Sequence, residues 1–284
     1  METCLDCGNK LSWARDTCPG CGSYVGAPNV REMAAEREYL VARYHGAIKE
    51  SQNRGCESNT LVFTAKVEAN SVAVINFWPE LLASFLRDDN ALYSNYELQT
   101  GAETRRAALM PNDRERRGTE GTLFGDYGSE IRYAALSLSL NSKGLVSYGS
   151  CAVVLRDKLC SNKASLLEEN SYSFVRRHRL LPGDEVPCGH RAAWQDRHLL
   201  ATAKLAVQIE EHTPPEAFAD LVLYSDGNRR TDEFIEVHVF GAFGKEAFVA
   251  TTIPNPAQSQ NDELYRLNEI QERLARLAIP CTLI

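Results

Sequence analysis

Four cysteines are concentrated at the start of the chain, and their spacing is that of a metal site. Cys4 and Cys7 form one C-x-x-C pair, and Cys18 and Cys21 form a second. A two-residue gap lets both thiolates of a pair reach one ion, and the glycine after each pair permits the turn that this requires. Four thiolates leave no open coordination position, so residues 1–27 are predicted to be a zinc ribbon with one structural Zn²⁺. Redox-active dithiols would need a βαβ context, which so short a segment does not supply.

A second group of candidate residues lies in the middle of the chain, where polar side chains interrupt apolar segments. They are Arg132, Tyr148, Ser171, Ser173 and Glu236. Glu236 stands within the apolar segment FIEVHVFG, and burial of a carboxylate is costly unless the group is paired or used. Alternation leaves a second interpretation open, in which Glu236 shares a solvated face with Phe234 and His238.

The order of these residues resembles that of ADP-ribosyltransferase toxins. Arg132, then the Ser171-Tyr172-Ser173 segment, then Glu236 follow the Arg–Ser–Glu order of that superfamily. Tyr148-Gly149 followed by CAVVL resembles its bacterial toxin-like members, as does the segment EFIEVHVFG. The similarity covers about residues 130–253.

The resemblance implies an NAD-dependent transferase that moves ADP-ribose onto a macromolecule, as a bacterial toxin or defence effector. It implies that Arg132 contacts the NAD phosphate or ribose and that Tyr148 and the serines Ser171 and Ser173 support the pocket. Glu236 would hydrogen-bond the nicotinamide ribose and stabilise oxocarbenium-like charge as nicotinamide leaves.

The chain departs from the family pattern at two places. Phe234 stands where many members carry the Glu or Gln that helps to choose the acceptor. The middle segment is Ser-Tyr-Ser rather than Ser-Thr-Ser. The resemblance therefore does not indicate an arginine acceptor, and the class of acceptor stays open.

Other functions use the same part of the chain. Asp220, followed by Glu236-Val237-His238, loosely resembles the metal-binding pattern of restriction-type nucleases, in which two carboxylates hold Mg²⁺. His238 replaces the lysine of those enzymes.

A third hypothesis is a zinc-ribbon adaptor whose β domain binds a protein. A cysteine nucleophile at Cys188 with His190 as its base is disfavoured, because a cysteine and a histidine so close in sequence rarely form a catalytic pair. The sequence has neither a Gly-rich phosphate loop nor an HExxH motif, so it does not support P-loop or zincin chemistry.

The elements that must position these residues follow from the apolar periodicity. Helices are predicted over 30–54, 79–86, 190–209 and 262–277. Strands are predicted over 61–67 and 71–77 as a hairpin, and over 132–140, 149–155, 221–224, 234–240 and 248–253, with a further strand starting at 170–173. The predicted fold class is α+β: the zinc ribbon, a linking helix over 28–56, and a body over 57–284 with a mixed or antiparallel sheet and flanking helices.

Residues 102–128 combine arginines with acids, glycines and one proline. The arginines are Arg105, Arg106, Arg114, Arg116 and Arg117. The composition predicts a long loop that either orders on meeting a partner or remains a solvated connection. The partner would be a macromolecular acceptor (RNA, DNA or protein) or an acidic inhibitory protein.

Composition limits the remaining possibilities. The formal charge of the 284-residue chain is −7, whereas a sequence-independent nucleic-acid binder is usually basic, so nucleic-acid contact would have to be local. No segment approaches the roughly 18 consecutive apolar residues of a membrane span, and no signal peptide precedes the ribbon. The five scattered cysteines have no framework spacing, which suits reduced thiols. We therefore expect a cytoplasmic protein.

Overall fold

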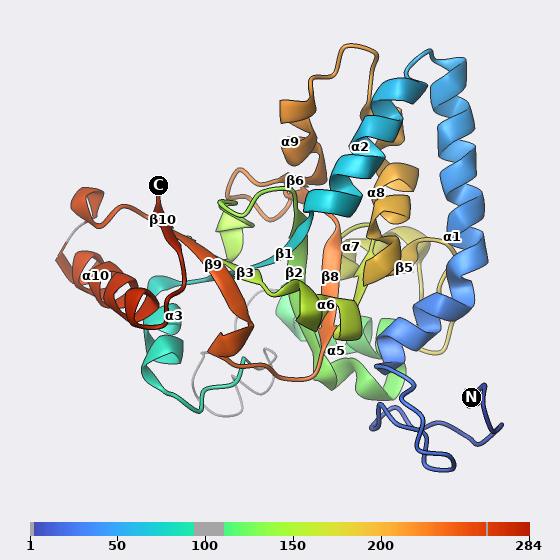
Figure 1. The fold of residues 1–284 in the computed structure, drawn as a ribbon, viewed down its shortest axis with the longest axis horizontal. Coiled ribbons are helices and arrows are strands. Elements are labelled where there is room, and N and C mark those ends of the chain that lie inside the picture. Colours follow the sequence, from blue (N-terminus) through green and yellow to red (C-terminus); the bar gives the residue numbers. More distant parts are fainter. Residues whose placement is uncertain (1–2, 94–110, 260) are drawn as a thin grey trace.

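The computed structural model describes residues 3–93, 111–259 and 261–284, without the side chains of residues 111–115, 117 and 261. The helices are α1 (Pro28–Asn53), α2 (Glu57–Asn70), α3 (Pro79–Arg87), α5 (Pro111–Phe124), α6 (Asp157–Lys163), α7 (Ser171–His178), α8 (Arg197–Leu205), α9 (Phe218–Val222) and α10 (Asn261–Arg276). The strands are β1 (Val72–Phe77), β2 (Ile131–Ser137), β3 (Cys151–Leu155), β4 (Ala164–Leu167), β5 (Arg191–Ala193), β6 (Leu223–Tyr224), β7 (Glu233–Phe234), β8 (Glu236–Phe240), β9 (Phe248–Ile253) and β10 (Cys281–Leu283). This arrangement, drawn in Figure 1, confirms the predicted α+β class.

The main sheet has eight strands in the order β10-β9-β3-β1-β2-β8-β4-β5. β9 and β10 run parallel and the other neighbouring pairs are antiparallel, so the sheet is mixed, as predicted. β8 lies between β2 and β4, which places Glu236 opposite Ala135 on one side and Leu167 on the other. β6 and β7 form a separate two-stranded sheet.

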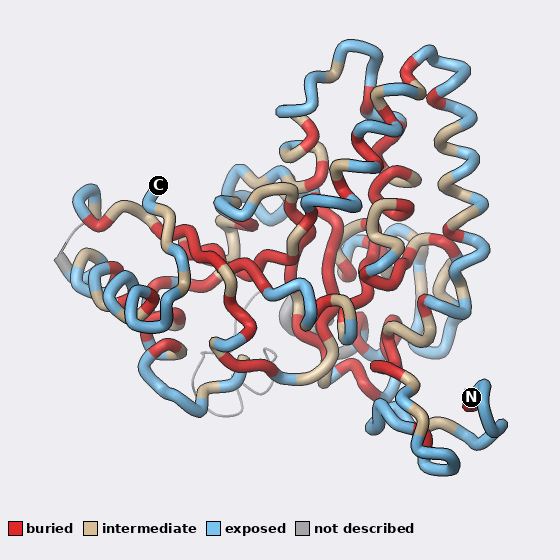
Figure 2. The backbone as a smooth tube through the Cα atoms, in the orientation of Figure 1, coloured by how far each residue is buried: buried red, intermediate tan, exposed pale blue. Residues whose placement is uncertain are grey.

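One face of the sheet belongs to the main hydrophobic core. Ile75, Leu136 and Val237 point into this core and meet Leu40 of α1 and Phe63 of α2. Figure 1 shows α1, α2 and α8 gathered toward one end of the sheet and α3 with α10 at the other. In Figure 2 the central strands are almost entirely buried, whereas α1 and α10 each keep one exposed side. This burial supplies the main hydrophobic stabilisation of the body.

The opposite face of the same strands is partly polar. Alternation along the strands puts four polar side chains on it: Asn76, Tyr133, Glu236 and His238. α5 and α7 cover part of this face through a smaller core that includes Phe124 and Phe174. The sheet thus has one largely apolar face, on which Arg132 is buried, and one face on which polar groups are enclosed by helices.

The segment predicted as a strand over 61–67 is helical, so the predicted hairpin is wrong. It belongs to α2, whose buried residues Thr60, Phe63, Thr64 and Val67 follow the spacing of a helix face. Thr and Val favour strands locally, but packing of this face against α8 decides the conformation.

Part of the segment predicted as a long loop over 102–128 is ordered as a helix. α5 occupies Pro111–Phe124 and a 3₁₀-helix follows over Gly125–Glu130. Leu123 and Phe124 are buried against α7 and β2, so tertiary packing offsets the weak helix preference of a glycine-containing segment. Arg105 and Arg106 lie outside the described residues, as do the side chains of Arg114 and Arg117.

Two further boundaries differ from the sequence prediction. Residues 171–178 form helix α7 rather than a strand, because the side chain of Asn170 accepts hydrogen bonds from the amides of Tyr172 and Ser173 and so caps a helix. The helix predicted over 190–209 begins only at Arg197, since residues 191–193 pair with β4 as β5.

In the described part of the chain, no helix is long and apolar enough to cross a membrane.

The two sides of α2 give a stability prediction. Phe63 is fully buried and packs edge-to-face on Phe218 at 5.2 Å between ring centroids, whereas Leu61 is 43% exposed. Phe63→Ala should lower the free energy of unfolding by about 3–5 kcal/mol, because it leaves a cavity. Leu61→Ala, the matched control, should cost less than about 1 kcal/mol. Equal losses in denaturant unfolding would contradict this orientation of α2.

Candidate functional site

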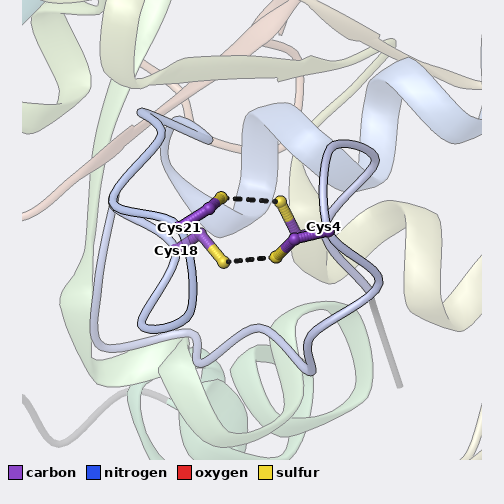
Figure 3. A group of neighbouring side chains, drawn as sticks. Cys4, Cys18 and Cys21 are labelled. Atoms are coloured by element: carbon purple, nitrogen blue, oxygen red, sulfur yellow. Dashed lines mark hydrogen bonds between the residues drawn. The ribbon is translucent and has the colours of Figure 1, made fainter.

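The four N-terminal cysteines form one cluster. The Sγ atoms of Cys4 and Cys21, both labelled in Figure 3, are 3.7 Å apart. The Sγ atoms of Cys7 and Cys18 are 3.5 Å apart. A tetrahedral ion with Zn–S bonds of about 2.3 Å has sulfur–sulfur edges of about 3.8 Å, so these distances fit a metal ion held by four thiolates. The geometry is compatible with structural zinc.

The two halves of the cluster have the same backbone design. The amide of Gly8 donates to the carbonyl of Cys4, and that of Gly22 donates to the carbonyl of Cys18. Both glycines have a positive φ, of 72° and 76°, which costs a residue with a Cβ atom more than it costs glycine. The glycine after each C-x-x-C pair therefore closes the turn that brings two sulfurs to one point.

The ribbon is fastened to the body at the start of α1. The Arg31 guanidinium donates to the carbonyls of Gly26 at 2.7 Å and of Ser12 at 3.3 Å. The buried amide of Asn29 lies within hydrogen-bond distance of the carbonyl of Lys163 and, at 2.9 Å, of the carbonyl of His238. The junction thus reaches strand β8.

A pocket lies over the polar face of the sheet. Its lining includes a carboxylate, two arginines and several side chains with hydroxyl or amide groups: Asn76, Arg116, Tyr133, Tyr148, Asn170, Ser171, Tyr172, Arg229 and Glu236. They come from β1, β2 and β8, from helices α5 and α7, and from two loops. Three of the residues singled out in the sequence, Tyr148, Ser171 and Glu236, are brought together here.

Glu236 is held within this pocket by one of its two carboxylate oxygens. It is only 5% exposed, so the interpretation as a solvated strand residue is wrong. Its Oε2 accepts from the Ser171 amide at 2.8 Å and from the Ser171 hydroxyl, and it lies 3.0 Å from Nε2 of His238. The other oxygen, Oε1, has a longer contact of 3.4 Å with the Asn170 amide. Several donors on one oxygen explain how a carboxylate is tolerated at this depth.

The N-terminus of α7 completes this arrangement. Ser171 is the first residue of the helix, and its amide is one of those that no intrahelical carbonyl can satisfy. Glu236 accepts from that amide, and the partial positive charge of the helix end favours a carboxylate there. The structure therefore assigns Ser171 a direct contact with Glu236.

Two arginines lie over tyrosine rings of the pocket. The Arg116 guanidinium is 4.8 Å from the ring centroid of Tyr133, and that of Arg229 is 4.4 Å from Tyr148. Arg116 is also paired with Glu120 at 3.1 Å, and the Tyr133 hydroxyl donates to the same carboxylate. Both guanidinium groups thus bring positive charge to the pocket wall, beside aromatic surface.

The tyrosine hydroxyls of the pocket stay protonated. Burial, followed by the charge of Glu120, raises the pKa of Tyr133 well above its ordinary value. Burial and then the charge of Glu236 raise the pKa of Tyr148. Both phenols are therefore neutral near pH 7 and able to donate hydrogen bonds.

The loop that carries Tyr148 is fixed to β1 by Asn76. The Asn76 amide donates to the carbonyls of Lys143 and Gly149, both at 2.9 Å, and its oxygen accepts from the amide of Leu145. A Cβ atom at Gly149 would lie 2.2 Å from the carbonyl carbon of Phe77, so the close approach requires glycine. This explains why glycine follows Tyr148.

Three residues singled out in the sequence lie elsewhere. Arg132 is 2% exposed on the other face of β2, and its guanidinium donates to the carbonyls of Tyr93 and Ser129. Ser173 lines a second cavity rather than the pocket. Asp220 is exposed on α9 and does not line the pocket with Glu236.

The second cavity adjoins the pocket, because Asn170 and Phe234 line both. Its charged lining consists of Arg43, Glu168, Glu169, Arg177, Lys204, Asp232 and Glu233. Burial opposes ionisation of Glu168, but contacts with His190, Arg43 and Arg177 outweigh it and lower the pKa to about 2. Glu168 is therefore a fixed negative charge at neutral pH.

Sequence reasoning did not assign Asn76, Tyr133 or Arg229 to the site, and it placed Arg116 in a loop. A polar residue inside the apolar strand VAVINF was a usable signal for Asn76. For Arg229 no local signal exists, because its position depends on how the 225–232 loop folds back over Ser147.

With this geometry in place, comparison with known proteins adds no identification: no protein-family model matches the chain, and no curated protein matches it either.

The cysteine cluster gives a prediction about metal. Cys4→Ser combined with Cys7→Ser should remove one equivalent of zinc and unfold the ribbon, since so small a unit buries too little apolar area to fold without its ion. The body should keep its own thermal transition, because its core is separate. Elemental analysis and thermal denaturation are the measurements, with Cys188→Ser, an exposed thiol outside the cluster, as the control. Protein purified without chelator that contains no zinc would end the claim.

Proposed function

We propose that the chain is an NAD-dependent ADP-ribosyltransferase that modifies a macromolecule, with Glu236 as its catalytic carboxylate. The observation that carries the proposal is the anchoring of Glu236 in a pocket that also holds Arg116 and Arg229. A fixed anion suits a reaction in which positive charge develops, and fixed cations suit a substrate that carries phosphates.

The proposed reaction transfers a sugar carbon. The bond between the ribose C1′ and the nicotinamide nitrogen breaks, and its electron pair leaves with nicotinamide. A nucleophile of the acceptor then forms a bond to C1′ and loses its proton. The ribose carries oxocarbenium-like positive charge in between, which the Glu236 carboxylate stabilises because it is already desolvated and oriented.

The contacts of Glu236 suit this role. Ser171 and His238 hold Oε2, which leaves Oε1 to accept a hydrogen bond from a ribose hydroxyl in the pocket. Ser171 and His238 are then positioning residues, because they fix the carboxylate without touching the reacting carbon. A carboxylate fixed in advance needs no reorganisation when charge develops.

Arg116 and Arg229 suit the diphosphate of NAD. Each guanidinium lies over a tyrosine ring of the pocket and brings a permanent positive charge, which suits phosphate groups. Tyr133 and Tyr148 add aromatic surface to the pocket, and Tyr148 adds a neutral hydroxyl that can donate to the substrate. This assignment differs from the family resemblance, in which Arg132 contacts NAD: Arg132 is buried against backbone carbonyls on the far face of β2.

We further propose that the four-cysteine cluster holds Zn²⁺ and that the ribbon presents the acceptor, nucleic acid or protein. The ion would have a structural role only, because four thiolates leave it no open position. A basic surface is not required of the whole chain if the ribbon contacts the acceptor locally, which agrees with the net charge of −7.

The nuclease hypothesis has less support. It needs two carboxylates around one Mg²⁺, but Asp220 is exposed on α9 while Glu236 is buried and bonded to Ser171. The adaptor hypothesis gives no reason to bury a carboxylate in a pocket with two arginines, since such burial is costly.

Glu236→Gln tests the catalytic assignment. The variant should keep its fold and much of its NAD binding but lose turnover by about 100-fold or more, because only the charge facing the transition state is removed. Transfer of label from NAD to cell extract, followed by separate RNase, DNase and protease treatments, measures activity and acceptor class together.

The matched control is Asp220→Asn. A transferase should tolerate it, whereas a Mg²⁺-dependent nuclease should lose cleavage in both variants and ignore NAD. Full NAD-dependent activity in folded Glu236→Gln protein would rule out this residue as the catalytic carboxylate.

Arg229→Ala tests the phosphate assignment. It should weaken NAD binding by about tenfold, with a smaller salt dependence than the wild type, because one charge-assisted contact is lost. Arg230→Ala, a neighbouring exposed arginine that does not line the pocket, is the control. Calorimetric titration with NAD at two salt concentrations is the measurement, and equal affinities for the wild type and Arg229→Ala would contradict the assignment.

A further inference from the structure

A group of possible metal ligands lies away from both the cysteine cluster and the pocket. It consists of Glu168, His178 and His190, whose ligand atoms all lie within 4.8 Å of one another. Glu168 directly follows β4, His178 is the last residue of α7, and His190 directly precedes β5. Three successive segments between residues 168 and 190 therefore contribute one donor each.

The fold fixes the three side chains relative to one another. The Glu168 amide donates to the carbonyl of His190 at 3.1 Å, which continues the pairing of β4 and β5. The two imidazoles pack on the buried ring of Phe174, with centroid distances of 4.4 Å to His178 and 5.7 Å to His190. Their orientation is thus set by core packing rather than by solvent.

One of these donors lacks a partner. Nε2 of His178 is buried and, among the described residues, has no hydrogen-bond partner. Nδ1 of His190 lies 2.8 Å from Oε1 of Glu168. A buried imidazole nitrogen is costly to leave unsatisfied, and a cation between it and the carboxylate would satisfy it.

We propose that Glu168, His178 and His190 form a second metal site, which binds Zn²⁺. Two imidazoles and one carboxylate are a donor set that zinc uses, and imidazole disfavours Mg²⁺ and Ca²⁺, which prefer oxygen ligands. Three protein ligands leave a fourth position for water or an anion.

The surroundings of Glu168 set the expected strength of the site. Arg43 lies 2.9 Å from Oε2 and Arg177 lies 2.6 Å from Oε1. Metal-binding carboxylates are commonly hydrogen-bonded in this way, which orients them. The two guanidinium groups also repel a divalent ion, and Glu169, paired with Arg177, offsets only part of this. The site is therefore weaker than the ribbon and loses its ion first to a chelator.

The ion would tie the C-terminal end of α7 to β4 and β5. The N-terminal end of the same helix carries Ser171, which holds Glu236. The site is separate from the chemistry at Glu236, so metal binding is testable whether or not the chain transfers ADP-ribose.

The experiment is a zinc titration of the full chain with a competing chromophoric chelator, after mild chelation that leaves the ribbon loaded. The wild type should take up one further equivalent, and so should Cys4→Ser/Cys7→Ser protein. His178→Ala and His190→Ala should lose it, whereas His45→Ala, which removes an exposed histidine of α1, should not.

A second variant distinguishes the loss of a metal ligand from a loss of the fold. His178→Gln keeps a similar volume against Phe174, so it should fold, but it should lose at least tenfold in zinc affinity because a neutral amide is a poor ligand. With Co²⁺ in the cysteine variant, the spectrum should show tetrahedral bands without thiolate charge transfer. A wild type that takes up no second equivalent, or His178→Gln and His190→Ala proteins that bind it as the wild type does, would overturn the proposal.

Discussion

The burial of one negative charge governs the polar half of this molecule. Glu236 is buried on an interior strand of the sheet, between β2 and β4, where an unpaired carboxylate would destabilise the fold. The N-terminus of α7 supplies the amide and hydroxyl of Ser171, and β8 itself supplies His238. α7 begins at Ser171, where its first amide reaches Glu236, and α5 packs against α7 over the pocket. The position of the α7 N-terminus beside β8 is therefore what keeps this charge satisfied.

The pocket also shows how cations are kept near a buried anion without neutralising it. The hydrogen bonds of Glu236 come from Ser171, Asn170 and His238, and two cations, Arg116 and Arg229, line the same pocket. They rest on Tyr133 and Tyr148, whose rings hold them by cation–π attraction. Opposite charges that line one cavity produce a local field, and such a field would suit the substrate of the proposed reaction.

Local signals predicted the elements whose periodicity was strong and failed where tertiary contacts decided the outcome. The C-x-x-C spacing located the cysteine cluster, and the apolar alternation located β1, β2, β8 and β9. The failures share one cause. Phe63 and Ser171 sit in segments with β-branched or aromatic neighbours that favour strands, but a buried helical stripe and the Asn170 cap override that preference. The cations of the pocket could not be predicted, because Arg116 and Arg229 arrive from segments that long-range packing places.

The attachment of the ribbon has a consequence for the limits of any shortened version of the protein. Asn29 belongs by sequence to the first turn of α1, next to the ribbon, yet its amide is buried against the carbonyl of His238. A chain that starts at residue 28 keeps this contact, whereas one that starts after residue 29 loses the side-chain amide that donates to β8. The boundary of the folded body therefore falls inside the first turn of α1 and not at the end of the cysteine motif.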